Sequence, residues 1–276
     1  MPNETLKDKL TMTVHTCDKY SDLWEGHFKL LNQNWPDRGI ETLLVTDAHT
    51  DRTFDGVRVI STGDGLELSE RVAAVLPQIK TEYILFALDD YYPIYPISTA
   101  KIERLIDIMD REGLDYVRLF KYPNSRKRLP GYKNLYQVSL TRNYAVNLFQ
   151  GIWRKSFLEK TVKNPKNAWM YEVSLTKIAA DCGAKCVQSK GNEYPILDIV
   201  SKGKILHKGK RYFKRNPIYH GNRETMPIKE EMRAFILNSA KTILPYRFIN
   251  YTRNVMRRHG HRFFSDSSGL NNGKGE

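Results

Sequence analysis

Residues 81–96, TEYILFALDDYYPIYP, decide how the rest of the chain is arranged. The uninterrupted apolar run Tyr83–Leu88 comes directly before two aspartates and a proline-rich stretch. A short apolar run bounded in this way is typical of a strand covered on both faces, as in a largely parallel sheet. Because ligands of open α/β sheets bind beyond the carboxyl ends of the strands, Asp89 and Asp90 are predicted to lie at a ligand site.

The adjacent aspartates predict a divalent cation and a phosphate-bearing ligand. Hard oxygen donors suit Mg²⁺ or Mn²⁺, and these ions in turn suit a diphosphate. The alternative is that Asp89 and Asp90 only begin a turn, since aspartate and proline are both common turn residues.

Patterns typical of strands and helices alternate along the first 200 residues. Strands are predicted at 10–17, 41–46, 58–60, 83–88, 116–120, 149–153, 185–188 and 197–200, and helices at 23–34, 68–79, 99–112, 155–162 and 166–182. This alternation with short links predicts an α/β domain with a doubly wound, mainly parallel sheet. The basic, tyrosine-rich stretch 121–148 is predicted to be an irregular excursion that lines a surface.

The net charge of +13 is concentrated near the C-terminus. Residues 1–200 carry 27 lysines and arginines against 26 aspartates and glutamates, whereas residues 201–263 carry 16 against 3. Such asymmetry predicts a polyanionic partner, which can be nucleic acid, an acidic membrane surface or ligand phosphates. We therefore expect an α/β domain at 1–205, a basic, aromatic and mainly helical extension at 206–264 with a helix at 228–244, and a disordered tail at 265–276.

The sequence lacks signals for export, membrane spanning or a cysteine framework. No apolar run approaches the roughly 20 residues that span a bilayer, and the first ten residues, MPNETLKDKL, have no apolar centre. We therefore expect a cytoplasmic protein. Cys17, Cys182 and Cys186 form no even-numbered disulfide set and have no zinc-site spacing, so they are predicted to be reduced.

Five motifs in a fixed order resemble those of a known enzyme group. They are TCDKY after the first strand, LSERV after a glycine turn, YILFALDDYY, QGIW and AWMYE. Together they resemble bacterial GT-A glycosyltransferases of capsule and lipopolysaccharide assembly, distant relatives of the family 2 enzymes that use nucleotide-diphosphate sugars. The resemblance covers about residues 11–205 and implies a GT-A-like, nucleotide-diphospho-sugar transferase fold.

In GT-A enzymes an acidic motif of the D-x-D kind holds a divalent cation that bridges the donor's diphosphate. Asp89 and Asp90 match this motif in place, but Tyr91 stands two residues after Asp89. Adjacent side chains on an extended strand point to opposite faces, so we expect one carboxylate to bind Mn²⁺ or Mg²⁺ directly and the other to hold a water molecule. The alternative is a metal-free enzyme in which lysine and arginine neutralise the diphosphate.

The resemblance also implies residues that bind the donor nucleotide. Thr16, Asp18 and Asp47 follow the first two strands, where the base and ribose bind in this fold. Ser69 and Arg71, on the helix after the glycine turn, are expected to face the nucleotide. The alternatives are that Asp18 caps a turn and that Arg71 belongs to a solvated helix face.

The basic stretch 202–215 is the next implied donor contact. It follows the point where GT-A enzymes often place a flexible loop over the donor phosphates. Lys204, His207 and Lys208 are the expected phosphate contacts. The alternative is that this charged stretch is only a solvated face.

Glu172 is implied as the catalytic base of an inverting transfer. Such a reaction needs a carboxylate that accepts the proton of the attacking hydroxyl. A helix N-terminus favours a carboxylate, and the flanking Trp169 and Tyr171 could stack on a sugar. Tyr91 and Trp153 are further expected acceptor or sugar contacts. The alternative is that Glu172 serves only the helix dipole and that Trp169 anchors the core.

The predicted function is transfer of a sugar from a nucleotide-diphosphate sugar to a hydroxyl of a glycan or lipid-linked acceptor in surface polysaccharide assembly. Residues 206–264 would then contact an anionic membrane surface at the inner face of the cytoplasmic membrane.

Two other functions remain open from the sequence. A sugar-phosphate nucleotidyltransferase normally has a glycine-rich loop after its first strand, whereas TCDKYSD contains no glycine. A non-enzymatic nucleic-acid-binding protein would explain the interleaved aromatic and basic residues of RYFKR and HRFF. The sequence contains no recognisable nucleic-acid-binding motif, so we expect no nucleic-acid partner.

Overall fold

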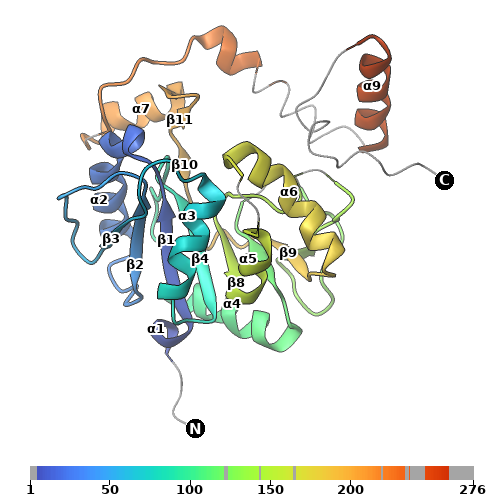
Figure 1. The fold of residues 1–276 in the computed structure, drawn as a ribbon, viewed down its shortest axis with the longest axis horizontal. Coiled ribbons are helices and arrows are strands. Elements are labelled where there is room, and N and C mark those ends of the chain that lie inside the picture. The colour runs from blue at the N-terminus through green and yellow to red at the C-terminus, as the bar shows by residue number, and fades with distance from the viewer. Residues whose placement is uncertain are drawn as a thin grey trace.

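The fold is a mixed α/β sheet covered by helices on both faces (Figure 1). It was obtained as a computed structural model, which describes residues 5–120, 124–142, 144–163, 166–218, 220–233, 236 and 246–260, with the side chains of 246–250 left out. The predicted tail 265–276 and most of the predicted helix 228–244 lie outside these residues. Residues 228–233 are helical, as predicted.

The central sheet has eight strands in the order β3-β2-β1-β4-β8-β6-β9-β7. The strands are β1 (Leu10–His15), β2 (Thr42–Thr46), β3 (Arg58–Ser61), β4 (Tyr83–Leu88), β6 (Tyr116–Arg118), β7 (Leu135–Gln137), β8 (Gly151–Arg154) and β9 (Cys186–Ser189). β3, β2, β1 and β4 are parallel neighbours, and β6 is parallel to β9. β8 is antiparallel to both β4 and β6, and β7 is antiparallel to β9. The predicted α/β class with a mainly parallel sheet is confirmed.

The helices form two layers with a hydrophobic core on each face of the sheet. They are α1 (Leu6–Lys9), α2 (Trp24–Asn34), α3 (Leu68–Val75), α4 (Thr99–Glu112), α5 (Lys155–Thr161), α6 (Ala168–Asp181), α7 (His207–Arg215) and α9 (Tyr246–Arg258). Side chains of α2 and α4 fill one core, and those of α3, α5 and α6 fill the other. Figure 1 shows α3, α5 and α6 in front of the strands.

β4 is apolar without a break because its side chains alternate between the two cores. Leu85 and Ala87 belong to the core with α2 and α4. Ile84 and Phe86 belong to the core with α3, α5 and α6. A strand covered on both faces has no solvated side, which explains the uninterrupted run that the sequence shows.

The predicted helix 68–79 ends early for a local reason. α3 stops at Val75, and a 3₁₀ turn, Leu76–Gln78, follows it. Pro77 has no amide hydrogen and fixes its own φ, so an α-helix is not expected to continue through it. A second 3₁₀ segment, Asp18–Leu23, precedes α2.

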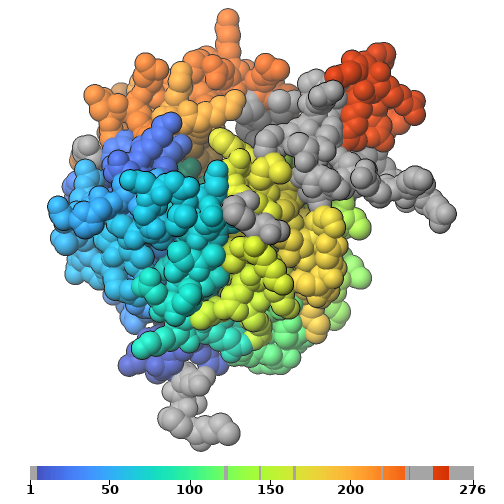
Figure 2. Space-filling model, viewed as in Figure 1, coloured from blue at the N-terminus to red at the C-terminus, as the bar shows by residue number. Residues whose placement is uncertain are grey.

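Small strands and α7 form a third layer beyond the carboxyl end of β4. β5 (Tyr91–Tyr92) pairs with β10 (Leu197–Asp198), and β11 (Val200–Ser201) pairs with β12 (Lys204–Ile205). A third apolar cluster joins residues of α2, β5, β11, β12, α7 and the segments next to them, namely Leu23, Leu30, Tyr92, Ile199, Val200, Ile205 and Phe213. In Figure 2 the orange surface that follows residue 200 lies against the blue N-terminal segment. α7 therefore packs on the α/β domain, although we predicted that the extension would begin at 206, and the domain division itself stays a prediction.

Gly151, at the start of β8, is required by the packing of an aromatic ring. A Cβ placed at this residue would lie 2.7 Å from Tyr116 Cε2 and 3.1 Å from the carbonyl oxygen of Val117. We expect Gly151→Ala to lower the free energy of unfolding by about 1–3 kcal/mol, because the ring cannot yield without disturbing the core. The urea midpoint of unfolding measures this change, and an unchanged midpoint would contradict the expected clash.

Candidate active site

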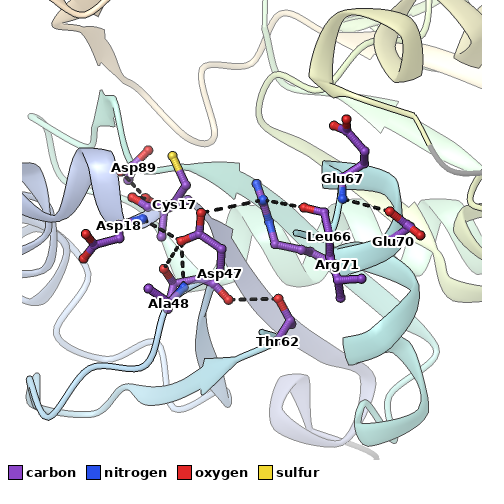
Figure 3. A network of polar contacts seen from close by, with 12 residues as sticks. Cys17, Asp18, Asp47, Ala48, Thr62, Leu66, Glu67, Glu70, Arg71 and Asp89 are labelled. Atoms are coloured by element: carbon purple, nitrogen blue, oxygen red, sulfur yellow. Dashed lines mark hydrogen bonds and ion pairs between the residues drawn. The ribbon is translucent and has the colours of Figure 1, made fainter. Parts of the chain in front are cut away.

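The carboxyl ends of β1, β2 and β4 meet at one edge of the sheet. These strands are parallel neighbours, so the residues that follow them are brought together. Figure 3 shows Cys17 between Asp89 and Asp47, with Asp18 next to them and Arg71 beyond Asp47. The predicted donor residues from the first, second and fourth strands therefore lie in one place.

Asp89 is buried and is held by a short hydrogen bond. Thr16 Oγ1 donates to Asp89 Oδ2 over 2.5 Å, and Trp24 Nε1 donates to Thr16 Oγ1 over 2.8 Å. Burial raises the pKa of Asp89 to about 7, although the hydrogen bond from Thr16 lowers it. Thr16, predicted to bind the nucleotide, thus fixes the orientation of the Asp89 carboxyl group.

Asp90 lies in a strongly acidic environment. Burial, followed by the charges of Asp89 and Asp198, raises the pKa of Asp90 well above its ordinary value. Its Oδ1 is buried and has no hydrogen-bond partner among the residues that the structure describes. Asp198 belongs to β10, opposite Tyr91, and forms an ion pair with Lys208 over 3.2 Å. The site therefore contains one carboxyl group, that of Asp198, which sequence reasoning did not expect.

The acidic residues suit a cation that substrate phosphates also bind better than a cation that is bound by protein groups alone. In the described part of the chain, no group of three or more histidine, cysteine, aspartate or glutamate side chains is arranged to hold a metal ion. Mg²⁺ is often bound by one or two carboxylates together with substrate phosphates. The orphaned buried oxygen of Asp90 and the adjacent Asp89 fit that second arrangement.

Asp47 organises the loop after β1 from the end of β2. Its Oδ1 accepts hydrogen bonds from the backbone amides of Asp18, over 2.7 Å, and Ala48, over 2.8 Å. Burial alone would raise the pKa of Asp47, but these bonds and the charge of Arg71 hold it below its ordinary value. The Asp47 carboxylate is thereby engaged by the protein, whereas the Asp18 side chain is exposed.

Arg71 reaches this edge of the sheet from α3. Its Nη1 donates to the carbonyl oxygen of Leu66 over 3.0 Å and lies 4.0 Å from Asp47 Oδ2 (Figure 3). Its Nε is buried without a hydrogen-bond partner among the described residues. Only 13% of the side chain is exposed, so Arg71 does not belong to a solvated helix face.

Ser69 has a structural contact in place of the predicted nucleotide contact. Its Oγ accepts a hydrogen bond from the backbone amide of Lys166 over 2.7 Å, and the residue is fully buried. This bond ties α3 to the segment that precedes α6. The expectation that Ser69 faces the nucleotide is therefore not met in this conformation.

Glu172 lies on α6, which packs with α3 and α5 on one face of the sheet. Asn167 caps this helix by accepting from the amide of Met170, so Glu172 is the fifth helical residue and lies beyond the first turn. Burial raises the pKa of Glu172 to about 7, although a long hydrogen bond of 3.5 Å from the Leu148 amide lowers it. Desolvation, and not the predicted helix N-terminus, therefore sets the protonation of Glu172.

Tyr91 connects the acidic pair to Glu172. Burial raises the pKa of Tyr91 well above its ordinary value, and the negative charges of Asp198, Asp90 and Glu172 raise it further. Phe149, whose ring contacts Tyr91, follows Leu148, the residue whose amide donates to Glu172. The Tyr91 ring also packs edge-on against Phe120 and Phe149, and only 8% of the residue is exposed.

Two predicted sugar contacts are core residues. Trp153 is fully buried and packs against Phe157 and Tyr116. Tyr171 is also fully buried, and its hydroxyl group is hydrogen-bonded to Thr161 over 2.7 Å. Neither ring can contact an acceptor in this conformation. Trp169, in contrast, is 70% exposed, so it is not a core anchor.

The basic residues after 202 belong to regular structure and form ion pairs. Lys204 lies on β12 and pairs with Glu224 over 3.6 Å, and His207 Nδ1 lies 2.6 Å from Glu231 Oε2 at the start of α7. The flexible loop that the resemblance implied at 202–215 is thus replaced by a strand and a helix. Lys208 forms an ion pair with Asp198, whose charge acts on Asp90. Of the three predicted phosphate contacts, Lys208 is therefore the one that is linked to the acidic pair.

Arg223 is a site residue that sequence reasoning missed. Its guanidinium donates to both carboxylate oxygens of Asp22, over 2.7 and 2.6 Å, and lies 4.5 Å from the centre of the Tyr20 ring. Its charge lowers the pKa of Asp89 and of Asp90. Nothing in the sequence distinguishes Arg223 from the other basic residues of the extension.

No family model and no curated protein sequence matches this chain. Among solved structures, it is similar to Staphylococcus aureus TarS, with 17% identity and a TM-score of 0.46 over 67% of this chain and 36% of that one. TarS residues 1–349 in complex with UDP give 16% identity and a TM-score of 0.45 over 67% and 59%. A nucleotidyl transferase from Methanothermobacter gives 12% identity and a TM-score of 0.45 over 69% and 92%. The similarity of this chain to these structures does not distinguish the reaction of TarS from that of the nucleotidyl transferase.

No helix in the described part of the chain is both long and apolar enough to cross a membrane. α9 carries Arg253, Arg257 and Arg258. Contact of residues 206–264 with an anionic membrane surface stays a prediction.

Proposed function

We propose that this chain transfers a sugar from a nucleotide-diphosphate sugar to a hydroxyl group of a glycan or lipid-linked acceptor, with inversion at the anomeric carbon. The main support is that the ring of Tyr91, which directly follows Asp89 and Asp90, packs against Phe149, the neighbour of the Leu148 amide that binds Glu172. Asp89 and Asp90, which would face the donor phosphates, and the candidate base Glu172 thus lie near the same side chain, that of Tyr91, at the carboxyl edge of the sheet. That arrangement suits a reaction in which a diphosphate leaves as a hydroxyl attacks.

The donor would bind across the ends of β1, β2 and β4. The exposed carboxylate of Asp18 can accept hydrogen bonds from ribose hydroxyls. Arg223, whose charge lowers the pKa of Asp89, and Arg71, which lies 4.0 Å from Asp47, would provide positive charge for the donor. Asp89 and Asp90 would hold the divalent cation, which when bound supplies positive charge for the leaving diphosphate.

Glu172 would act as the general base. The acceptor oxygen forms a bond to the anomeric carbon while the bond between that carbon and the diphosphate oxygen breaks. The hydroxyl proton passes to Glu172, and the nucleoside diphosphate leaves with the electron pair. A base whose pKa lies near 7 balances the ionised fraction against proton affinity at neutral pH.

Nucleotide binding is tested by thermal stability. A nucleoside diphosphate at 100 times its Kd is expected to stabilise the protein by about 2.7 kcal/mol, because it binds only the folded chain. Arg71→Gln should reduce this ligand-dependent shift, whereas Arg104→Gln, at an exposed position of α4, should leave it unchanged. A panel of bases with and without Mn²⁺ would also report nucleotide preference and metal need.

A full ligand-dependent shift in Arg71→Gln would remove Arg71 from the donor site. The absence of a shift with every nucleoside diphosphate would contradict the proposed donor. Nucleotidyl transfer, the alternative from the sequence, predicts pyrophosphate release from a nucleoside triphosphate and a sugar phosphate, and the proposed reaction does not.

A further inference from the structure

A positively charged cavity of about 210 Å³ opens beside the carboxyl end of β6. Its basic lining residues are Arg118, Arg126, Lys127 and Arg142, and no aspartate or glutamate is among the described residues that line it. Arg118 is the last residue of β6, and the other three lie in the 124–142 segment. None of the predicted donor or base residues lines this cavity.

Arg118 is a built part of the cavity wall. It is fully buried, and its Nε and Nη1 donate to the carbonyl oxygens of Phe120, over 3.2 Å, and Ala145, over 2.6 Å. Burial lowers the pKa of Arg118 to about 10, and the nearby positive charge of Arg142 contributes to this decrease. Arg142 is itself fixed by donating to the carbonyl oxygen of Asn124 over 3.3 Å. Two guanidinium groups are thus held close enough to repel each other.

An anionic group is the ligand that this arrangement recognises best. An oxyanion between the guanidinium groups would relieve their repulsion and accept charge-assisted hydrogen bonds. Serine hydroxyl groups of Ser125 and Ser139, which also line the cavity, can donate further bonds. The volume is below the roughly 300–1,000 Å³ of pockets that enclose drug-sized ligands, so the cavity suits one charged group of a larger molecule.

The cavity lies away from the nucleotide side of the sheet and close to Glu172. β4 and β8 lie between β1 and β6, so at about 4.8 Å between strands the cavity is roughly 14 Å from the end of β1 and roughly 10 Å from that of β4. The carbonyl oxygen of Ala145 binds Arg118, and the amide of Leu148 binds Glu172. Three residues of chain span at most about 10 Å, so one molecule can reach both places.

We propose that this cavity binds a phosphate or carboxylate group of the acceptor whose hydroxyl group Glu172 deprotonates. The assignment to the acceptor rests on the proposed function, whereas the affinity for an anionic group does not. The acceptor class is therefore an anionic glycan or glycolipid, with its charged group near the reacting hydroxyl.

The test measures inorganic phosphate binding to the full chain by titration of thermal stability, with the donor site saturated by a nucleoside diphosphate. We expect saturable stabilisation that sodium chloride at equal ionic strength does not reproduce. The double variant Arg126→Gln/Lys127→Gln should weaken phosphate binding by about tenfold or more, because it removes hydrogen bonds from charged groups, and the loss of one such bond lowers affinity by about that factor. Both side chains are exposed, so this variant should fold.

Lys80→Gln is the matched control, because Lys80 is an exposed cation that lines a different cavity. It should bind phosphate as the unmodified protein does. Arg142→Gln gives a second, independent variant in which the same loss is expected. Glucose 6-phosphate, glucuronate and glucose then distinguish phosphate from carboxylate, with glucose expected not to compete with phosphate.

Equal phosphate affinity in both cavity variants and the unmodified protein would overturn the proposal, as would stabilisation reproduced by chloride. The nucleoside diphosphate titration is independent of these results. Loss of nucleotide binding with phosphate binding intact would contradict the proposed function and leave the anion site in place. Nucleotide binding without phosphate binding would contradict the anion site alone.

Discussion

Glu172→Gln is expected to lower the rate of sugar transfer by a factor of about 10²–10⁴, the usual contribution of a positioned general base. The glutamine side chain keeps the shape of the carboxyl group and can still accept the long hydrogen bond from the Leu148 amide. It cannot accept the hydroxyl proton at neutral pH. Transfer should therefore fall while the affinity for the nucleoside diphosphate stays unchanged.

The pH dependence of transfer gives a second measure of the same role. Burial raises the pKa of Glu172 to about 7, and only its ionised form can accept a proton. The value of kcat/KM should therefore rise about tenfold per pH unit below pH 7 and level off above it. Glu172→Gln should make this rise shallower and leave only the contribution of Asp89, whose pKa is also raised to about 7, whereas a variant with only a structural defect would keep the full rise.

Glu159→Gln is the matched control for this prediction. Glu159 is a half-exposed glutamate on the neighbouring helix α5, 4.0 Å from Lys155. Its replacement should leave both the rate and the pH profile unchanged. Full turnover by Glu172→Gln would remove the assigned base, and a product with retained anomeric configuration would contradict a single displacement.

The sequence predicted the fold well wherever an element is determined by its own pattern. The helix Thr99–Glu112 has the predicted bounds, because it carries one apolar stripe and ends before Gly113, which adopts a left-handed conformation. The direction of Gly151–Arg154 was not predicted. An apolar strand reads the same in either direction, and its antiparallel pairing depends on how the long 121–148 excursion returns.

Helix α7 shows where local patterns fail. The sequence HKGKRYFKR is highly polar and contains glycine, so it was interpreted as a charged stretch, although the extension 206–264 as a whole was expected to be mainly helical. In the structure, Phe213 and the backbone at Gly209 pack on the third apolar cluster, with a Cβ at Gly209 only 3.3 Å from Ile199. Tertiary packing stabilises this helix more than its intrinsic propensity does.

The site was predictable only in its sheet-derived part. Asp89 and Asp47 follow parallel strands, so their proximity follows from topology. Arg223 reaches its partner Asp22 across 201 residues, and no periodic pattern reports such a contact. Trp153 and Tyr171 show a related limit, because an aromatic residue that packs in a core has the same sequence signature as one that stacks on a sugar.

The acidic pair should lower stability as the pH rises. Burial and the charge of Asp89 raise the pKa of Asp90 well above its ordinary value of 3.8. The folded protein therefore holds the Asp90 proton at pH values where the unfolded chain has released it. Stability linked to this group is fully present below about pH 4 and is lost as the pH rises toward the folded-state pKa.

Asp90→Asn should consequently raise the melting temperature at pH 8 while it reduces transfer. The amide stays neutral, so repulsion with Asp89 and the penalty for a buried charge disappear; each 1 kcal/mol regained raises Tm by about 2–4 °C. At pH 4 the melting temperatures of variant and unmodified protein should nearly coincide. Asp107→Asn, at an exposed position of α4, should show no pH-dependent difference.

Melting curves at pH 4, 6 and 8, measured beside transfer rates, separate the two effects. A higher melting temperature together with lower activity would mean that the acidic pair is retained for the donor phosphates at the expense of stability. A lower melting temperature at pH 8 would instead mean that the Asp90 carboxylate is compensated within the folded chain. Its buried oxygen would then have a protein partner and would not be available to a cation.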